Sequence, residues 1–248
     1  MAGHSHAANV ARRKNAVDAV RAKLFSKYSR EITVAAKLGG GDPNFNPRLR
    51  AAISAARSES MPNDRIDHAV KKGAGGLEGA NYEELTYEGY GPGGVALVVE
   101  TMSDNKNRTA AEIRSVFAKY HGNLGTPGSV AWMFKKKAYF VVSGASEDRV
   151  LEVTLEAEPD DIKSAANNQI EVIAPVEKFD AVEKALKTAN LAISASKLTF
   201  IPDNAVPVTD LDTAKSLMTL IDKLEDHDDV QNVHANYDIP EEILNKLN

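Results

Sequence analysis

Basic side chains are concentrated near the start of the chain, where seven lysines and arginines and a single acid, Asp18, lie between residues 12 and 30. Lysine and arginine side chains bind phosphate oxygens and release the counterions that are condensed on a nucleic acid. Further cations follow in polar segments later in the chain. The candidate nucleic-acid-binding residues are Arg12, Arg13, Lys14, Arg21, Lys23, Lys27, Arg30, Lys37, Arg48, Arg50, Lys71, Lys72, Lys106 and Arg108.

A helix is needed to display the first group of cations. Neither glycine nor proline occurs from residue 9 to residue 38, and apolar residues recur every three or four positions, at Val17, Val20, Leu24, Tyr28 and Ile32. This spacing is typical of an amphipathic helix. At about 100° per residue, cations flank the apolar stripe on both sides, with Arg12, Lys23, Lys27 and Arg30 on one flank and Lys14 and Arg21 on the other. The pattern predicts a basic helix over residues 9–37 that can lie along a phosphate backbone, although the same cations could simply solvate a helix.

Two shorter helices are predicted after the glycine run at residues 39–41 stops the first one. Asn46 is a favourable N-cap residue with Pro47 at the first helical position, and Pro62 opens another helix that ends at Gly73. Residues 1–77 are therefore predicted to form a small helical domain. The cations on these helices either extend the basic surface or are ordinary solvated side chains: Arg48, Arg50, Lys71 and Lys72.

The charge of the chain is divided unevenly along its length. Residues 1–77 hold 14 lysines and arginines against 6 acids, whereas the remainder holds 16 against 29, so the net charge of −5 conceals +8 followed by −13. A basic end on an acidic body suits a polyanionic partner that is contacted by one face only, because the rest of the molecule repels it.

The periodicity of apolar residues changes after a glycine-rich segment, residues 73–79, which is predicted to be a linker. Strands are predicted over residues 82–90, 95–101 and 129–134, with a helix over 109–120 in which Thr109 and Glu112 have the spacing of a capping box. The loop before this helix carries Lys106 and Arg108. Amides at a helix N-terminus favour an anion, but the pattern is more typical of an ordinary strand-to-helix loop.

The next elements are predicted as strand 138–142, helix 147–157, strands 161–165 and 170–174, helix 176–189 and strand 192–201. This βαββαβ order is ferredoxin-like. A later helix around residues 214–224 and a strand over 230–237 have no sheet of their own, so they are expected to return to the earlier sheet. The predicted fold class is multi-domain α+β: a three-helix domain, residues 1–77, followed by two ferredoxin-like α/β domains. The last, residues 138–202, is inserted into a discontinuous middle domain, residues 82–137 plus 203–248.

Several functional classes find no support in the sequence. The chain has no cysteine, which removes disulfides, thiolate metal sites and cysteine nucleophiles. No glycine-rich segment ends in the lysine and hydroxyl residue of a phosphate loop, and no nucleophile or metalloprotease motif occurs. The six histidines are scattered without the spacing of a metal site. We therefore expect a non-enzymatic protein without cofactor, metal or small-molecule substrate.

Several long segments resemble the YebC family, whose mitochondrial relatives include the translational activator of cytochrome c oxidase subunit one. They are REITVAAKLGGGDPNFNPRLRAAI at residues 30–53, KKGAGGLEGANYEELTYEGYGPGGVALVVE at 71–100, NRTAAEIR at 107–114, GNLGTPGSVAWMF at 122–134 and DDVQNVHANYDIPEE at 228–242, together with the opening MAGHS. The resemblance covers essentially the whole chain. It implies a three-domain cytoplasmic protein, and members are described either as DNA-binding transcriptional regulators or as translation factors acting at the ribosome.

The opening of the chain departs from the usual family pattern, which is similar to HSKWANIKHRK. The differences place His6, Ala7, Ala11 and Arg12 where the pattern has other residues, including a tryptophan at the position of Ala7. Stacking of that tryptophan on a base cannot be carried over to this chain. The first helix is therefore expected to bind more by charge than by stacking.

The sequence leaves three functional hypotheses. The first is a translation factor that contacts ribosomal RNA through the helical domain, and the acidic body favours it because such a body is a poor general coat for DNA. The second is a DNA-binding transcriptional regulator that uses the same helix, although no dimeric helix-turn-helix pattern is evident. The third is an enzyme or a scaffold for proteins. We expect a cytoplasmic monomer that binds nucleic acid, with the ribosome as a further partner and no membrane contact, since no long apolar run is present.

Overall fold

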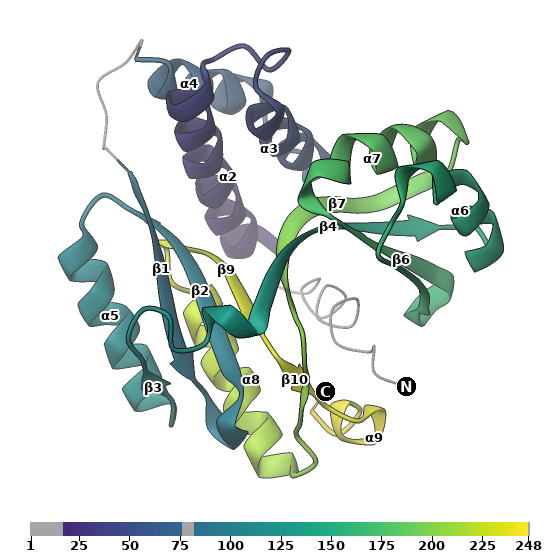
Figure 1. Cartoon of the computed structure of the whole chain (residues 1–248). Helices are drawn as coiled ribbons and strands as arrows, with labels where there is room; N and C mark the ends of the chain where they lie inside the picture. Colours follow the sequence, from purple (N-terminus) through teal and green to yellow (C-terminus); the bar gives the residue numbers. More distant parts are fainter. Residues whose placement is uncertain (1–16, 76–81, 248) are drawn as a thin grey trace.

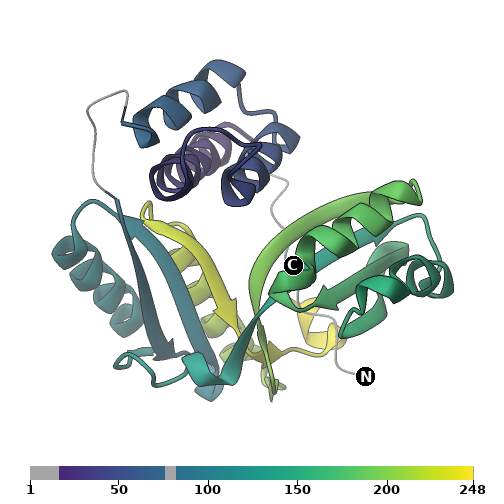
Figure 2. The ribbon, with the colours of Figure 1, turned by 45° about the horizontal axis from the view of Figure 1, so that its top comes forward.

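The computed structural model of the chain describes residues 17–75 and 82–247, which form three parts (Figure 1). Figure 2 shows the helical part above the other two parts, which lie side by side beneath it. The predicted helix start at residues 9–16, with Arg12, Arg13 and Lys14, lies outside the described residues, as does most of the predicted linker. For Val17 and Val20 of the predicted apolar stripe, the structure describes the backbone and not the side chains. The multi-domain α+β fold class is confirmed.

Three helices form the first part: α2 (Val17–Gly39), α3 (Pro47–Ser58) and α4 (Asn63–Gly73). The predicted cap is confirmed, since the Asn46 side chain accepts a hydrogen bond from the Leu49 amide at 3.0 Å, with Pro47 at the first helical position. The Asn46 amide group also donates to the carbonyls of Ala35 and Gly40, both at 2.8 Å. One buried side chain therefore satisfies orphan backbone groups at the end of α2 and at the start of α3.

The core of the helical part combines alanines with larger apolar residues. It contains Phe25, Ile32, Ala35, Ala36, Leu49, Ala52, Ile53, Ala56, Met61, Ile66 and Ala69. Ile32 of the predicted stripe is fully buried, whereas Leu24 and Tyr28 are half-buried. α2 and α4 cross closely because Gly73 lies against α2, where an added Cβ would stand 2.2 Å from the Thr33 carbonyl oxygen.

The middle part is a four-stranded antiparallel sheet in the order β3-β1-β2-β9, and its helices α5 and α8 cover one face (Figure 1). Its strands and helices are β1 (Glu83–Tyr90), β2 (Ala96–Ser103), α5 (Lys106–Lys119), β3 (Asn123–Leu124), α8 (Leu211–Glu225) and β9 (Val230–Ala235). The predicted return of the C-terminal helix and strand to this sheet is confirmed by the pairing of β9 with β2. Short elements complete it: η1 (Pro92–Gly94), β8 (Val206–Pro207), β10 (Tyr237–Asp238) and α9 (Glu241–Leu244).

The inserted part has the predicted ferredoxin-like order, with a sheet arranged β5-β6-β4-β7. Its main elements are β4 (Phe134–Ser143), α6 (Glu147–Thr154), β5 (Asp161–Ala165), β6 (Gln169–Ala174), α7 (Phe179–Thr188) and β7 (Ala192–Pro202), with the short helices η3 (Leu155–Ala157), η4 (Ala166–Asn168) and η5 (Val176–Lys178) between them. The middle part also has one layer of strands and one layer of helices. Its order of elements differs, because it begins with two consecutive strands, β1 and β2, that pair as a hairpin. Each of the three parts has its own buried cluster, and the domain bounds given above stay a prediction.

Two local predictions are wrong. Of the predicted strand at residues 129–134, residues 129–133 do not form a strand, because the buried Glu88 carboxylate accepts the backbone amides of Gly128, Val130 and Ala131 at 2.7, 2.8 and 2.7 Å. A short helix, η2 (Ala131–Met133), follows instead. Burial acts to raise the pKa of Glu88, but these three hydrogen bonds outweigh it and lower the pKa.

The second wrong prediction is the start of α5. Its N-cap is Asn105, whose side chain accepts the Arg108 amide at 3.1 Å, and the helix begins at Lys106. Thr109 is fully buried and does not cap the helix. Its hydroxyl instead contacts Ser103 and Asp229, both at 2.6 Å.

The inserted and middle parts meet where β7 reaches the open face of the middle sheet. The Phe200 ring packs edge-on against His234, with ring centroids 5.2 Å apart. His234 is buried, and its Nε2 lies 2.9 Å from Glu100 Oε2 while its Nδ1 lies 3.4 Å from the Thr199 hydroxyl. These contacts join the end of the inserted part to the middle sheet.

Candidate nucleic-acid interface

A cavity of about 490 Å³ lies between α2 and α4, beside the point where the chain enters the middle domain at Tyr82. We call it the α2–α4 cavity. One face of each helix lines this cavity. The lining residues include Ser26, Ser29, Arg30 and Thr33 of α2 and Arg65, His68 and Lys72 of α4, at the three- and four-residue spacing of a single helix face. Among the described residues that line it, Asp64 is the one acid.

The two helices are held together under this cavity. The Thr33 hydroxyl donates to the Ser29 carbonyl at 2.7 Å and lies 3.3 Å from the Ala69 carbonyl of α4. With Gly73 against the same turn of α2, the floor of the cavity is a tight helix crossing. The cations at its rim are therefore carried by two closely packed helices.

Aromatic rings orient the cations around the α2–α4 cavity. The guanidinium carbon of Arg30 lies 5.7 Å from the centroid of the Tyr82 ring, and Lys72 Nζ lies 5.4 Å from the same centroid. The Arg65 guanidinium lies 5.9 Å from the ring of Phe25. Such cation–π contacts are worth about 0.5–1 kcal/mol at exposed sites, which is enough to bias a side-chain rotamer.

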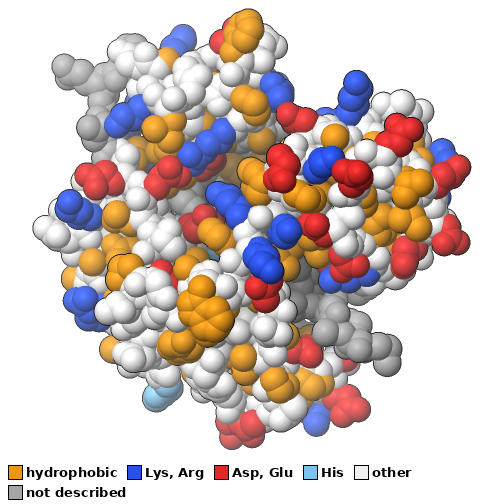
Figure 3. Space-filling view, in the orientation of Figure 1, with side chains coloured by type: hydrophobic (Ala, Val, Ile, Leu, Met, Phe, Trp, Pro, Cys, Tyr) orange, Lys and Arg blue, Asp and Glu red, His pale blue; other side chains and the backbone are white. Residues whose placement is uncertain are grey.

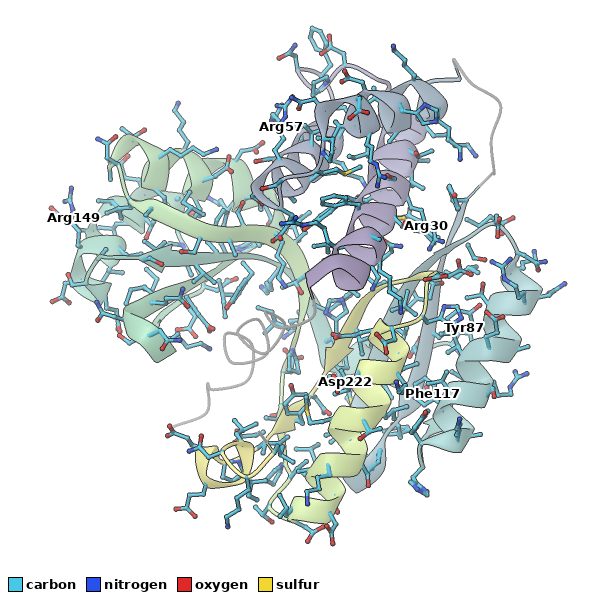
Figure 4. The ribbon with its side chains drawn as sticks, turned by 180° about the vertical axis from the view of Figure 1, so that it is seen from behind. Arg30, Arg57, Tyr87, Phe117, Arg149 and Asp222 are labelled. Atoms are coloured by element: carbon cyan, nitrogen blue, oxygen red, sulfur yellow. The ribbon has the colours of Figure 1, made fainter. Side chains whose placement is uncertain are left out.

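A second basic surface on α2 faces the middle domain, and we call Lys23, Lys27 and Arg30 the docked row. Lys23 Nζ donates to the Asp226 carbonyl at 3.1 Å, and Lys27 Nζ donates to the Glu225 carbonyl at 2.8 Å. Arg30 donates to the Asp228 carbonyl and lies 3.4 Å from the Asp229 carboxylate. Figure 4 shows Arg30 on α2 beside the middle domain. The end of α8 attracts these cations because the last carbonyls of a helix accept no hydrogen bond from the helix itself and carry the negative end of its dipole.

Asp229 anchors the loop that the docked row contacts. Its buried carboxylate accepts hydrogen bonds from the Thr109 hydroxyl at 2.6 Å and from Arg108 at 2.9 Å. Burial alone would raise the pKa of Asp229, but the hydrogen bonds from Thr109 and Arg108 and the charge of Arg30 outweigh it, so the pKa is lowered. The carboxylate therefore stays ionised and joins α2, α5 and the loop after α8.

Other predicted cations also have partners within the chain. Arg48 forms ion pairs with Glu31 at 2.7 Å and with Glu84 at 2.5 Å, tying α3 to α2 and β1. Burial acts to lower the pKa of Arg48, but these two carboxylates outweigh it and raise the pKa. Arg50 donates to the Pro43 carbonyl at 3.0 Å.

The structure brings only some of the predicted residues together. Arg30 and Lys72 meet at the α2–α4 cavity, whereas Arg108 forms ion pairs with Asp104 and Asp229 in the middle domain. The remaining described members of the prediction are exposed at separate places on the surface: Arg21, Lys37, Lys71 and Lys106. Several Lys and Arg side chains border the hollow between the helical domain and the rest of the molecule (Figure 3).

Three residues of the α2–α4 cavity, Arg65, His68 and Tyr82, were missed from the sequence. Arg65, His68 and Lys72 have spacings of three and four, which place them on one face of the predicted helix after Pro62. Only Lys72 of these was selected. Tyr82 carried no signal, because its role depends on the path of the chain between two domains.

Within the described residues, no group of three or more histidine, aspartate or glutamate side chains is placed to hold a metal ion. None of the described helices is both long and apolar enough to cross a membrane.

Comparison with known proteins gives full-length matches. A family model described as the TACO1/YebC protein N-terminal domain matches residues 5–76, and one described as the TACO1/YebC second and third domain matches residues 82–237. A protein of Methylacidiphilum infernorum named "Probable transcriptional regulatory protein" is 54% identical over 98% of both chains. One of Fusobacterium nucleatum with a similar name is 49% identical over 100% of both chains.

A solved structure has the same fold. The crystal structure of a conserved hypothetical protein from Aquifex aeolicus superimposes with a TM-score of 0.85 at 44% sequence identity. The match covers 94% of this chain and 96% of that one.

Proposed function

The chain belongs to the TACO1/YebC family, and from this premise we propose that it is a non-enzymatic, nucleic-acid-binding regulator of gene expression. The observation that carries the proposal is the convergence of Arg30, Arg65 and Lys72 on one cavity of the helical domain. Residues 1–77 have a net charge of +8, and the rest of the chain has −13. The names of the relatives from Methylacidiphilum infernorum and Fusobacterium nucleatum, which describe transcriptional regulatory proteins, support regulation as the role.

The finer proposal is a translation factor that contacts ribosomal RNA. A folded RNA offers phosphates from several directions and unpaired nucleotides between its helices, which suits a small basic domain on an acidic body. The acidic body opposes close approach to a long uniform duplex. The alternative, a DNA-binding transcriptional regulator, is favoured by the names of the relatives.

Cosedimentation of the full chain with purified ribosomes at rising salt tests the proposal. We expect the chain to move with the ribosome at low salt and to be released as the salt concentration rises, because phosphate contacts are weakened by salt. The translation reading fails if the chain stays at the top of the gradient at low salt yet binds a promoter duplex tightly against competitor DNA. In that case the transcriptional alternative replaces it.

A charge-reversal pair locates the surface. Arg21→Glu combined with Lys71→Glu changes two exposed cations of the helical domain and should release the chain from ribosomes at lower salt. Arg114→Glu combined with Lys184→Glu makes the same change in charge on exposed positions of the other two domains and serves as the control. Equal effects of the two pairs would show that net charge, and not the helical domain, governs binding.

A further inference from the structure

The cations of the α2–α4 cavity differ in how far the chain itself neutralises them. Arg30 already contacts the Asp229 carboxylate at 3.4 Å. Within the part of the chain that the structure describes, Arg65 and Lys72 have no carboxylate within ion-pair distance, although Lys72 and Arg30 share the ring of Tyr82. Arg65 and Lys72 outnumber Asp64, the acid among the described lining residues, so the site keeps a positive potential, which an anion can neutralise.

The cavity has the size and donors for one phosphorylated unit. Its volume of about 490 Å³ falls in the range of about 300–1,000 Å³ that small-molecule sites occupy. Arginine can bind two phosphate oxygens at once, and lysine adds a point charge. The Ser29 side chain, which also lines the cavity, supplies a hydroxyl.

The shape of the cavity selects the kind of strand. A double helix presents its phosphates on a convex surface with the bases turned inward, so an intact duplex can only touch the rim. A nucleotide that is unpaired, in a loop, a bulge or a single strand, can turn its phosphate and sugar into a concave site. We infer that the α2–α4 cavity binds a single unpaired nucleotide of a nucleic-acid strand, held at its phosphate by Arg65 and Lys72.

This inference rests on the proposed function, because it names the nucleic-acid element that the helical domain recognises. The test uses the full chain and two probes, a short single-stranded oligouridine and an RNA duplex of equal length, in fluorescence anisotropy titrations. Arg65→Glu combined with Lys72→Glu is the test variant. Arg57→Glu is the control, since Arg57 is an exposed residue of α3 that does not line the cavity and lies apart from Arg30 (Figure 4).

We expect the double variant to bind the single strand at least about tenfold more weakly than the wild-type chain, with a salt slope smaller by about one. Its affinity for the duplex should change much less. The control should retain single-strand affinity within about twofold. An equal loss on single strand and duplex would overturn the inference, because it would describe a general basic surface, and so would an unchanged affinity for the single strand.

A mononucleotide separates this inference from the proposed function. Uridine monophosphate should bind the wild-type chain in an NMR titration and shift amides of α2 and α4, whereas uridine should not. The double variant should lose these shifts. If the chain binds uridine monophosphate in this way but neither ribosomes nor DNA, the proposed function fails and the cavity stands as a nucleotide site. If ribosome binding persists and uridine monophosphate shifts no amides of these helices, the cavity inference fails alone.

Discussion

The docked row and the α2–α4 cavity are two basic surfaces of one small domain, and they differ in what faces them. Lys23 and Lys27 of the docked row donate to carbonyls at the end of α8. Arg65 and Lys72 of the cavity have aromatic rings as neighbours and no carboxylate partner among the described residues. Cations of the same type therefore have different roles: the first set attaches the helical domain to the body, and the second is left for an external anion.

Arg30 is the residue that the two surfaces share. It donates to the Asp228 carbonyl, lies near the Asp229 carboxylate and also lines the cavity over Tyr82. A ligand in the cavity would therefore meet a side chain that also holds the loop after α8. Lys23 and Lys27 contact the middle domain, Arg65 and Lys72 face the cavity, and Arg30 does both.

The largest expected effect comes from removing the anchor of the docked row. Asp229→Ala should lower the free energy of unfolding by about 2–3 kcal/mol, because a buried carboxylate that accepts Thr109 and Arg108 is lost and both donors are left without it. Urea denaturation measures this. Asp228→Ala is the matched control, since Asp228 is exposed and contributes a backbone carbonyl that the substitution keeps. Equal losses for the two variants would contradict the assignment of Asp229 as the anchor.

The contribution of Asp229 to the free energy of unfolding should depend on pH. Because the folded chain lowers the pKa of Asp229, its contribution to stability is fully present above the unfolded value of about 3.9 and is lost as pH falls through the folded value. The difference in unfolding free energy between the wild type and Asp229→Asn should be constant near neutral pH and should shrink below about pH 4. A difference that stays constant into the acid range would show that the charge of Asp229 is not what stabilises the loop.

A smaller effect is expected from reversing the docked row itself. Lys23→Glu combined with Lys27→Glu should cost about 1 kcal/mol of stability, since these contacts are partly exposed and are made to carbonyls next to acidic side chains that would now repel α2. Small-angle scattering should show a larger radius of gyration as the helical domain separates. Affinity for single-stranded RNA should fall less than in the Arg65 and Lys72 double variant. A larger fall in affinity would contradict the assignment of Lys23 and Lys27 to attachment of the domain and of Arg65 and Lys72 to ligand binding.

The smallest effect is expected at the cavity rim when stability is measured. Arg65→Ala should change the free energy of unfolding by less than about 0.5 kcal/mol, because Arg65 is exposed and has one cation–π contact, with Phe25. Thermal denaturation of the variant beside the wild type measures it. A loss above about 1 kcal/mol would assign Arg65 to the structure of the domain and weaken its assignment to ligand binding.

Much of the fold was predictable because local signals agreed with the tertiary structure. The cap at Asn46 and the βαββαβ order of the inserted domain were both predicted. The predicted strand at residues 129–134 was wrong because its amides are bound by Glu88, which is some forty residues away in sequence and on another strand. Local periodicity cannot report a partner at that distance.

The candidate site was only partly predictable. Charge counting identified the helical domain and selected both Arg30 and Lys72. It could not distinguish the cations that the chain neutralises itself from those that it leaves available, and it omitted Arg65 and His68. The positions of Arg12, Arg13 and Lys14 lie outside the described residues, and their part in binding stays a prediction.

By itself the sequence determined the separation of charge between a basic helical domain and an acidic body, because that separation depends only on residue types along the chain. It also determined the order of most helices and strands, which follows from local periodicity and capping. Only the tertiary structure decided the use of each cation. The packing of α8 against the helical domain gives the docked row its partners, and the crossing of α2 with α4 creates the cavity. Both depend on residues that are far apart in sequence, whose distances are fixed only when the domains pack together.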